Sequence, residues 1–269
     1  MSQVIFAAFS NRDDAVALAH EAVAQLGHEG ISAALHRLDV DEPQGIDDDA
    51  LVVSLGGDGT FLKAARLAHG FGARVLPVDL GRLGFLLAVP SNDVVEGVKT
   101  AQRRGEAVER LALEVTSPGS DLVEFALNEV VVERAQGGQM VRVRTFIDGD
   151  EYLTYSADGV MVATPTGSTG YSFSCGGPVV DASLQVLILS PIAPHFTIDR
   201  SIVVDAAKEI RLEADNKPAI IVADGRTIAS LAPGGCVEVR RNPRPVRVVA
   251  TSRVELGFRL REALRQGHA

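Results

Sequence analysis

The stretch Leu51-Val52-Val53-Ser54-Leu55-Gly56-Gly57-Asp58-Gly59-Thr60 decides how the first part of the chain folds. Its apolar half predicts a buried strand, and helical spacing predicts a helix from Thr60 to about His69. A cluster of glycines around one carboxylate separates the two elements. Because α/β sheets bind ligands at the carboxyl ends of their strands, this turn is a candidate site for a phosphate-bearing ligand.

Asp58 leaves three interpretations open. Its side chain could simply cap the following helix. A carboxylate beside phosphates is otherwise repelled, unless it accepts a proton from an attacking hydroxyl or holds a divalent metal that bridges phosphates. The stretch is neither a Walker A loop nor a G-x-G-x-x-G fingerprint, since Leu62 stands where the third glycine would be.

Outward from this stretch, strand and helix patterns alternate over the first hundred residues, which predicts a mostly parallel sheet in an α/β domain. After Glu106 the pattern changes to short β-rich runs separated by turn residues. We therefore expect a two-domain fold: an α/β, Rossmann-like domain over residues 1–105 and a β-rich domain over 106–269, whose C-terminal tail could pack on the first. The expected first-domain elements are strands at 4–9, 33–38, 51–55 and 74–78 and helices at 13–26, 60–69 and 91–104.

Composition restricts the classes of function. The chain has 26 basic and 35 acidic residues among 269, a net charge of −9, which argues against non-specific nucleic-acid binding. No long apolar run predicts a membrane span, and the N-terminus lacks the basic start of a signal peptide. Two cysteines cannot form a disulfide framework, so a reducing cytoplasm is the expected compartment.

A second motif runs from Asp158-Gly159 through Thr164-Pro165 to Pro178. A predicted strand is followed by a loop rich in Ser, Thr and Gly. Such a loop can wrap a polar, phosphate-bearing ligand with hydroxyl and amide donors and without fixed positive charge. The alternative, an ST-rich surface loop, does not explain the spacing of the whole block.

These two motifs together resemble those of the NAD kinase family. The first resembles its GGDGT segment, which diacylglycerol kinases and 6-phosphofructokinases share more loosely. The second resembles its D-G-x4-T-P-T-G-S-T-A-Y-S-x-S-x-G-G-P block, with Gly170 replacing Ala. Shorter segments also resemble the family's: 79–86 (with Asp79 for Asn), 127–130, 191–195 and 223–226 (with Arg226 for Gln).

The resemblance implies phosphorylation of the adenosine-ribose 2′-hydroxyl of NAD, with ATP or polyphosphate as donor and a divalent cation, most simply Mg²⁺, on the phosphates. Asp58 would be the catalytic residue, and the NAD site would lie between the domains of a homodimer or homotetramer. The implied nucleotide-binding residues are Gly57, Gly59, Lys63, Phe85, Asn128, Glu129, Ser156, Asp158, Thr169, Gly170, Tyr171, Ser172, Phe173 and Ser174, with Gln139, His195 and Arg226 held more weakly.

Several of these residues keep a plainer interpretation. Asn128-Glu129 alone would be a strand-end turn, and adjacent strand residues face one ligand only where the strand ends or bends. Lys63 could be an exposed helix lysine, His195 a structural histidine, and Asp224-Gly225 before Arg226 a hairpin turn. The rival functions are a lipid or sphingoid kinase of the same superfamily and a non-catalytic NAD(H)-binding sensor.

Overall fold

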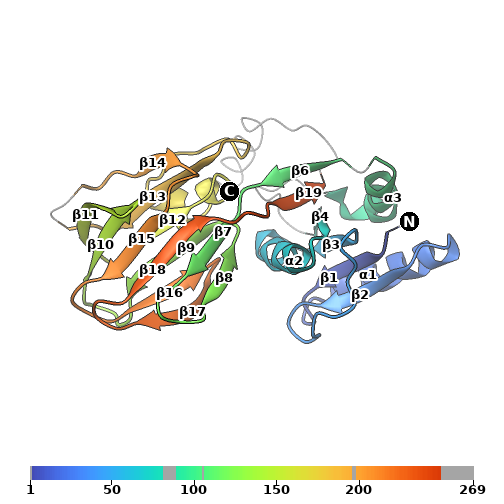
Figure 1. Cartoon of the computed structure of the whole chain (residues 1–269). Coiled ribbons are helices and arrows are strands. Elements are labelled where there is room, and N and C mark those ends of the chain that lie inside the picture. The colour runs from blue at the N-terminus through green and yellow to red at the C-terminus, as the bar shows by residue number, and fades with distance from the viewer. Residues whose placement is uncertain (1, 81–88, 105, 196–197, 250–269) are drawn as a thin grey trace, which may run out of the picture. The chain divides into compact units, whose positions relative to one another are not determined.

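The computed structural model describes residues 2–80, 89–104, 106–195 and 198–249 (Figure 1). These residues form two units: residues up to Glu109 together with those from Val246 onward, and residues Arg110–Pro245. No helix within the described ranges is long and apolar enough to cross a membrane. Each unit has its own hydrophobic core, so each is described by itself.

The first unit is built on a seven-stranded sheet with the order β2-β1-β3-β4-β19-β6, in which β5 also pairs with β4. The pairs β1–β2, β1–β3, β3–β4, β4–β5 and β4–β19 are parallel. Both β1 and β3 are buried along their whole length, as continuous apolar runs predict for a sheet covered on both faces. The strands are β1 (Val4–Ala8), β2 (Ala33–Arg37), β3 (Leu51–Leu55), β4 (Arg74–Asp79), β5 (Val89–Pro90), β6 (Ala107–Arg110) and β19 (Val246–Val249).

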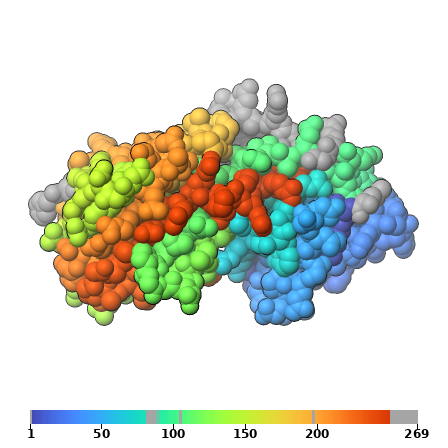
Figure 2. All heavy atoms as spheres, in the orientation of Figure 1, coloured from blue at the N-terminus to red at the C-terminus, as the bar shows by residue number. Residues whose placement is uncertain are grey.

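Three helices pack on this sheet: α1 (Asp13–His28), α2 (Asp58–Phe71) and α3 (Val94–Arg104), the last preceded by a 3₁₀ turn at Ser91–Asp93. Buried alanines of α1 and valines of α3 share one core with Leu51, Val53 and Leu55 of β3. Helix α2 ends at Gly72, whose φ of 73° gives the left-handed cap that glycine accommodates. In Figure 2 the blue and cyan atoms of these early elements form one continuous mass.

The second unit is a sandwich of two six-stranded sheets, with orders β11-β10-β15-β18-β7-β8 and β14-β13-β12-β9-β16-β17. Residues from both sheets form a single core around the fully buried Tyr155. The first sheet holds β7 (Leu113–Thr116), β8 (Val123–Ala126), β10 (Val141–Ile147), β11 (Asp150–Ala157), β15 (Ile210–Ala214) and β18 (Cys236–Arg241). The second holds β9 (Glu129–Arg134), β12 (Gly159–Ala163), β13 (Val186–Ile192), β14 (Ile202–Asp205), β16 (Ala219–Ala223) and β17 (Arg226–Leu231).

The expected fold class, an α/β unit followed by a β-rich unit, is confirmed. Two details differ from expectation. The loop predicted after β12 contains a 3₁₀ turn (Gly167–Thr169) and a one-turn helix, α4 (Tyr171–Ser174). The chain also returns to the first sheet at β19, because Val248 pairs with Val75 of β4. Residues 258–265, where a short helix was predicted, lie outside the described residues.

Candidate active site

The Gly56–Thr60 turn connects the end of β3 to the start of α2, and its first glycine is required by both conformation and space. Gly56 has a φ of 155°, and a Cβ there would lie 2.3 Å from the hydroxyl oxygen of Thr60. The backbone N–H of Gly56 donates to the carbonyl of Val78 in β4. The turn is therefore tied to the neighbouring strand, and it positions the start of the helix at the carboxyl edge of the sheet.

Gly57, Asp58 and Gly59 are exposed at this helix start. Gly57 is the N-cap residue and Asp58 belongs to the first turn, where the helix dipole favours a negative charge. A Cβ on either glycine would meet no atom of the described residues within 4 Å. Within the described ranges neither glycine packs against another element, so the first-turn backbone is suited to an anionic ligand.

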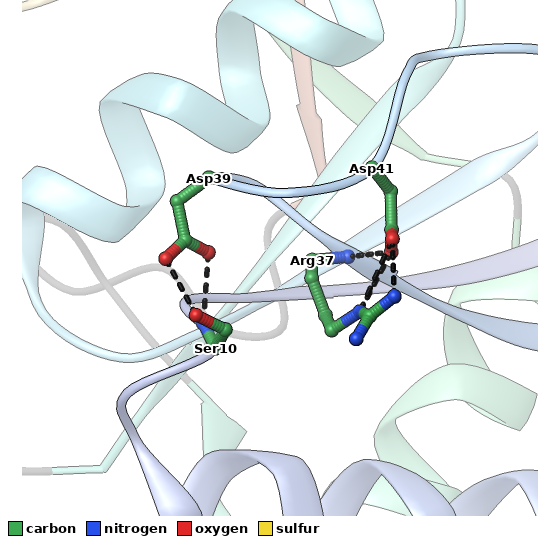
Figure 3. Close-up of polar contacts among 4 residues, drawn as sticks. All are labelled: Ser10, Arg37, Asp39 and Asp41. Atoms are coloured by element: carbon green, nitrogen blue, oxygen red, sulfur yellow. Dashed lines mark hydrogen bonds and ion pairs between the residues drawn. The ribbon is translucent and has the colours of Figure 1, made fainter.

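The loops that leave β1 and β2 are joined beside this edge (Figure 3). Asp39 accepts hydrogen bonds from the Ser10 amide at 2.8 Å and the Ser10 hydroxyl at 2.7 Å. These bonds, and more weakly the charge of Lys63, hold the pKa of Asp39 below its ordinary value. Lys63 lies over the Phe9 ring, 4.5 Å from its centroid. Lys63 therefore lies near the Asp39 carboxylate as well as the Phe9 ring.

Asn128 lies in the break between β8 and β9, and Glu129 is the first residue of β9. A Cβ added to Gly170 would lie 3.6 Å from the Asn128 amide nitrogen and 3.7 Å from the Glu129 Oε2 atom. Both side chains therefore extend toward Gly170. The interruption between the strands is the reason that adjacent residues can face one place.

Glu129 is only 8% exposed. Burial, and then the nearby charge of Asp224, raise the pKa of its carboxyl group to about 7. Its Oε2 atom is buried and has no hydrogen-bond partner among the described residues. A buried polar atom without a partner is costly, and a ligand hydroxyl would satisfy it.

Asp158 lies between β11 and β12 and pairs with Arg134 at the end of β9, with 3.2 Å between the charged atoms. The Arg134 amide also donates to the Asp158 carbonyl at 3.0 Å. Arg134 lines a pocket of about 110 Å³ together with Gln139, Met140 and Lys217. Arg134 thus contacts Asp158 and also lines the pocket that contains Gln139.

The Thr164–Gly177 loop is buried on one side and exposed on the other. Thr166 and Ser172 are buried, and the hydroxyl oxygen of each lacks a partner within the part of the chain that is described. The side chains of Tyr171 and Phe173 are 41% and 46% exposed, which is unusual for large rings. The loop therefore offers unused hydroxyls and exposed aromatic surface next to Asn128 and Glu129.

The other predicted residues are less concentrated. Ser156 lies in β11, and its carbonyl accepts the His195 amide at 2.8 Å. Arg226 begins β17 and pairs with Glu124 of β8 at 2.8 Å. Thr169 closes the 3₁₀ turn and Ser174 is exposed at the end of α4. Phe85 lies outside the described residues.

Sequence reasoning did not give Asp224 or Thr164 a role of its own, although both contact the Asn128 segment. The Asp224 carboxylate accepts backbone N–H groups from Leu127, Asn128 and Glu129. The Thr164 hydroxyl donates to the Leu127 carbonyl at 2.6 Å. An Asp-Gly pair between two strands does predict a turn, but nothing local indicates which backbone its carboxylate will bind.

No group of three or more His, Cys, Asp or Glu side chains that could hold a metal occurs in the described ranges. A Mg²⁺ ion that binds with nucleotide phosphates needs only one or two protein carboxylates. The exposed Asp58 carboxylate, at a turn open to phosphates, fits that demand.

The Gly-rich helix start of the α/β unit, and the buried polar atoms that lack partners among the described residues of the β-sandwich, fit a nucleotide-dependent phosphotransferase. Two family models match the chain: the ATP-NAD kinase N-terminal domain over residues 14–105 and the ATP-NAD kinase C-terminal domain over residues 127–251. The chain belongs to the ATP-NAD kinase family, and is therefore an enzyme rather than a binding module.

Individual relatives agree with this assignment. The NAD kinase of Gemmatimonas aurantiaca is 36% identical over 223 residues, which cover 80% of this chain and 77% of the relative. An Archaeoglobus fulgidus NAD kinase, solved in complex with ATP, is 28% identical with a TM-score of 0.76 and 99% of both chains covered. Yeast NADH kinase, solved with NADH, shares the fold at a TM-score of 0.82, with 22% identity and coverage of 100% and 89%.

Proposed function

We propose that this enzyme transfers the terminal phosphoryl group of ATP to the 2′-hydroxyl of the adenosine ribose of NAD, forming NADP. The observation that carries the proposal is the match of both family models, each over the segment that holds one of the two motifs. The ATP complex of the Archaeoglobus relative supports ATP as the donor. Polyphosphate is the alternative donor that the experiment must include.

Phosphoryl transfer requires positioning and charge neutralisation more than covalent chemistry. In this proposal the open backbone at Gly57 and Gly59 receives donor phosphates, with Lys63 as a neighbouring cation. Asp58 orients the acceptor hydroxyl and takes its proton. A divalent cation, most simply Mg²⁺, would neutralise charge on the phosphates that bind at this turn.

The acceptor side of the proposal uses residues of the second unit. Asn128 and Glu129 bind the hydroxyls of the adenosine ribose, which would satisfy the buried Glu129 Oε2 atom. Asp158 binds the nicotinamide half, and the exposed side of α4 lies along the pyrophosphate. The residues assigned to that half are Asp158, Thr169, Gly170, Tyr171, Ser172, Phe173 and Ser174, with Phe85 against the adenine and Ser156, Gln139, His195 and Arg226 as weaker candidates.

The test is an assay of NADP formation in which donor and acceptor are varied independently. Purified enzyme with Mg²⁺ is given ATP, GTP or polyphosphate as donor, and NAD, NADH or diacylglycerol as acceptor. NADP formation from NAD and ATP is expected. Phosphorylation of the lipid instead, or tight NAD binding with no NADP from any donor, would overturn the proposal in favour of a lipid kinase or a sensor.

The family also implies a homodimer or homotetramer in the cytoplasm, and both statements stay predictions. Light scattering coupled to size exclusion checks the first, because a monomer has a mass of 28.4 kDa. A measured mass of two or four times that value is expected.

A further inference from the structure

The turn between β16 and β17 binds the Leu127–Glu129 segment through the carboxylate of Asp224. Asp224 Oδ2 accepts the Leu127 amide at 2.7 Å, and Oδ1 accepts the amides of Asn128 and Glu129 at 2.8 and 3.2 Å. Three consecutive amides that converge on one anion form a nest. Hydrogen bonds to a charged acceptor are the stronger kind, so this contact fixes the backbone of all three residues.

The turn keeps an uncommon conformation to make this contact. Asp224 has a φ of 47°, in the left-handed region that non-glycine residues seldom adopt, and Gly225 follows with 75°. The Asp224 amide donates in turn to the Glu129 carbonyl at 3.0 Å. Asp224 therefore forms hydrogen bonds to the Leu127–Glu129 segment through its backbone as well as its side chain.

The opposite side of the segment is held by the loop after β12. The Thr164 amide donates to the Asn128 carbonyl at 2.8 Å, and its hydroxyl donates to the Leu127 carbonyl at 2.6 Å. A Cβ on Gly167 would lie 2.2 Å from the Asn128 carbonyl oxygen. With the backbone fixed on both sides, the Asn128 and Glu129 side chains are the parts of this segment that extend toward Gly170.

We propose that Asp224 is a positioning residue of the phosphoryl-transfer reaction, which fixes Asn128 and Glu129 for the acceptor ribose. The inference rests on the proposed function, since it takes those two side chains as the ribose contacts. Asp224 acts through them and is assigned no contact of its own with the substrate.

The surroundings of Glu129 give this role an electrostatic consequence. Among the described residues, Asp224 of the β16–β17 turn acts on the Glu129 carboxyl group, and Glu129 in turn acts on Tyr171 and Cys175 of the α4 segment. Burial is the first cause of the raised pKa of Glu129 and Asp224 the second. Removal of the Asp224 charge must therefore lower that pKa without returning it to its ordinary value.

A matched control exists in the same unit. The β10–β11 hairpin also turns on an Asp-Gly pair with positive φ, 51° at Asp148 and 86° at Gly149. The Asp148 carboxylate likewise accepts a backbone amide, from Glu209 at 3.0 Å, and pairs with Lys208. Asp148→Asn therefore alters an equivalent turn in the other sheet, at a residue that is not assigned to NAD.

The experiment compares Asp224→Asn with Asp148→Asn in the full-length enzyme. Asp224→Asn is expected to raise KM for NAD about tenfold or more, the scale of a lost charge-assisted hydrogen bond, with kcat less affected. It should also lower the pKa of the Glu129 carboxyl group, measured from the ¹³C NMR shift of the carboxyl carbon. The limb of the pH profile of kcat/KM that reports Glu129 should move to lower pH. Asp148→Asn should leave KM and both pH measurements unchanged.

Equal effects of the two substitutions, or an unchanged Glu129 titration in Asp224→Asn, would reduce Asp224 to a turn residue and overturn the inference. The NMR titration does not depend on turnover, so wild-type enzyme that forms no NADP defeats the proposed function separately. If Asp224→Asn does not fold, Asp224→Glu replaces it. That variant keeps the charge but displaces the acceptor, so KM for NAD should rise while the Glu129 titration stays in place.

Discussion

Glycines cluster in both motifs, but exposed glycines stand out in the first motif and closely packed ones in the second, with Gly56 and Gly170 as exceptions. In the first unit, Gly57 and Gly59 are exposed, and a Cβ on either would touch none of the residues that the structure describes. In the second unit, a Cβ on Gly159, Gly167 or Gly177 would lie within 3 Å of protein atoms. The first set leaves backbone open to a ligand, whereas the second set lets the protein pack closely against itself.

The carboxylates follow the same division. Asp58 is exposed at a helix start, whereas Glu129 is buried with a raised pKa. An exposed carboxylate can meet a reacting group at little cost in desolvation, whereas a buried one requires a rigid surrounding to hold it in place. The open motif is thus suited to the reaction itself, and the packed motif to holding the acceptor.

The largest effect is expected at the open motif. Asp58→Asn removes the base and should lower kcat by at least about 100-fold, on the scale of general-base catalysis, while NAD still binds. Steady-state kinetics and calorimetric titration with NAD measure the two quantities. Asp13→Asn, a matched change in the first turn of α1, should leave both near wild type. Turnover by Asp58→Asn within a few-fold of wild type would contradict the assignment.

Glu129→Gln tests the buried carboxylate through stability. Because its folded pKa of about 7 exceeds the unfolded value of about 4.5, the folded state holds the proton more tightly, and this group makes the protein less stable as pH rises from 4.5 through 7. Glu129→Gln has no carboxyl group to ionise, so its free energy of unfolding does not include this decrease with pH. We expect it to gain at most about 3 kcal/mol over wild type at pH 8.5, and little at pH 4.5.

Urea unfolding at pH 4.5 and pH 8.5 measures this difference in the free energy of unfolding. KM for NAD should rise in the same variant, because the carboxylate is assigned to the ribose. A stability difference that does not change between the two pH values would show that Glu129 titrates normally.

Gly167→Ala tests the packing of the second motif. The added methyl would lie 2.2 Å from the Asn128 carbonyl oxygen, and backbone cannot move aside as a flexible side chain can. We expect a loss of about 1–3 kcal/mol in the free energy of unfolding, as overpacking typically costs, together with weaker NAD binding. Thermal unfolding and the same NAD titration check both. An unchanged melting temperature would mean that the two segments separate easily.

The smallest effect is expected for Gly170→Ala, three residues further on. Its Cβ would lie 3.4 Å from the Gly167 carbonyl oxygen and further from Asn128 and Glu129, at ordinary contact distances. The free energy of unfolding should change by less than about 0.5 kcal/mol, and KM for NAD by less than about twofold. A loss in the free energy of unfolding equal to that of Gly167→Ala would show that the distance from an added Cβ to its neighbours does not decide the cost of substitution at these glycines.

Much of the fold was predictable because local patterns carry it. The apolar run at 51–55 and the helical spacing at 13–26 gave β3 and most of α1, since burial on a regular element repeats with the period of that element. The α2 helix starts at Asp58 rather than Thr60, because Gly57 takes the cap position. The short helix at Tyr171–Ser174 was missed because a single turn shows no period.

The sequence by itself determined the class of fold and the family, because the periodicities are local and the motifs are contiguous. Only the tertiary structure decided which segments meet: β19 with β4, Arg134 with Asp158, and Asp224 with the Asn128 amide 96 residues earlier in the chain. The Asp224-Gly225 pair predicts a turn of the backbone at these two residues, but it does not predict which group the Asp224 carboxylate binds. That partner is set by the register of β9 against β16, in which Val130 pairs with Ala223. Strand register between distant segments depends on how the whole core packs.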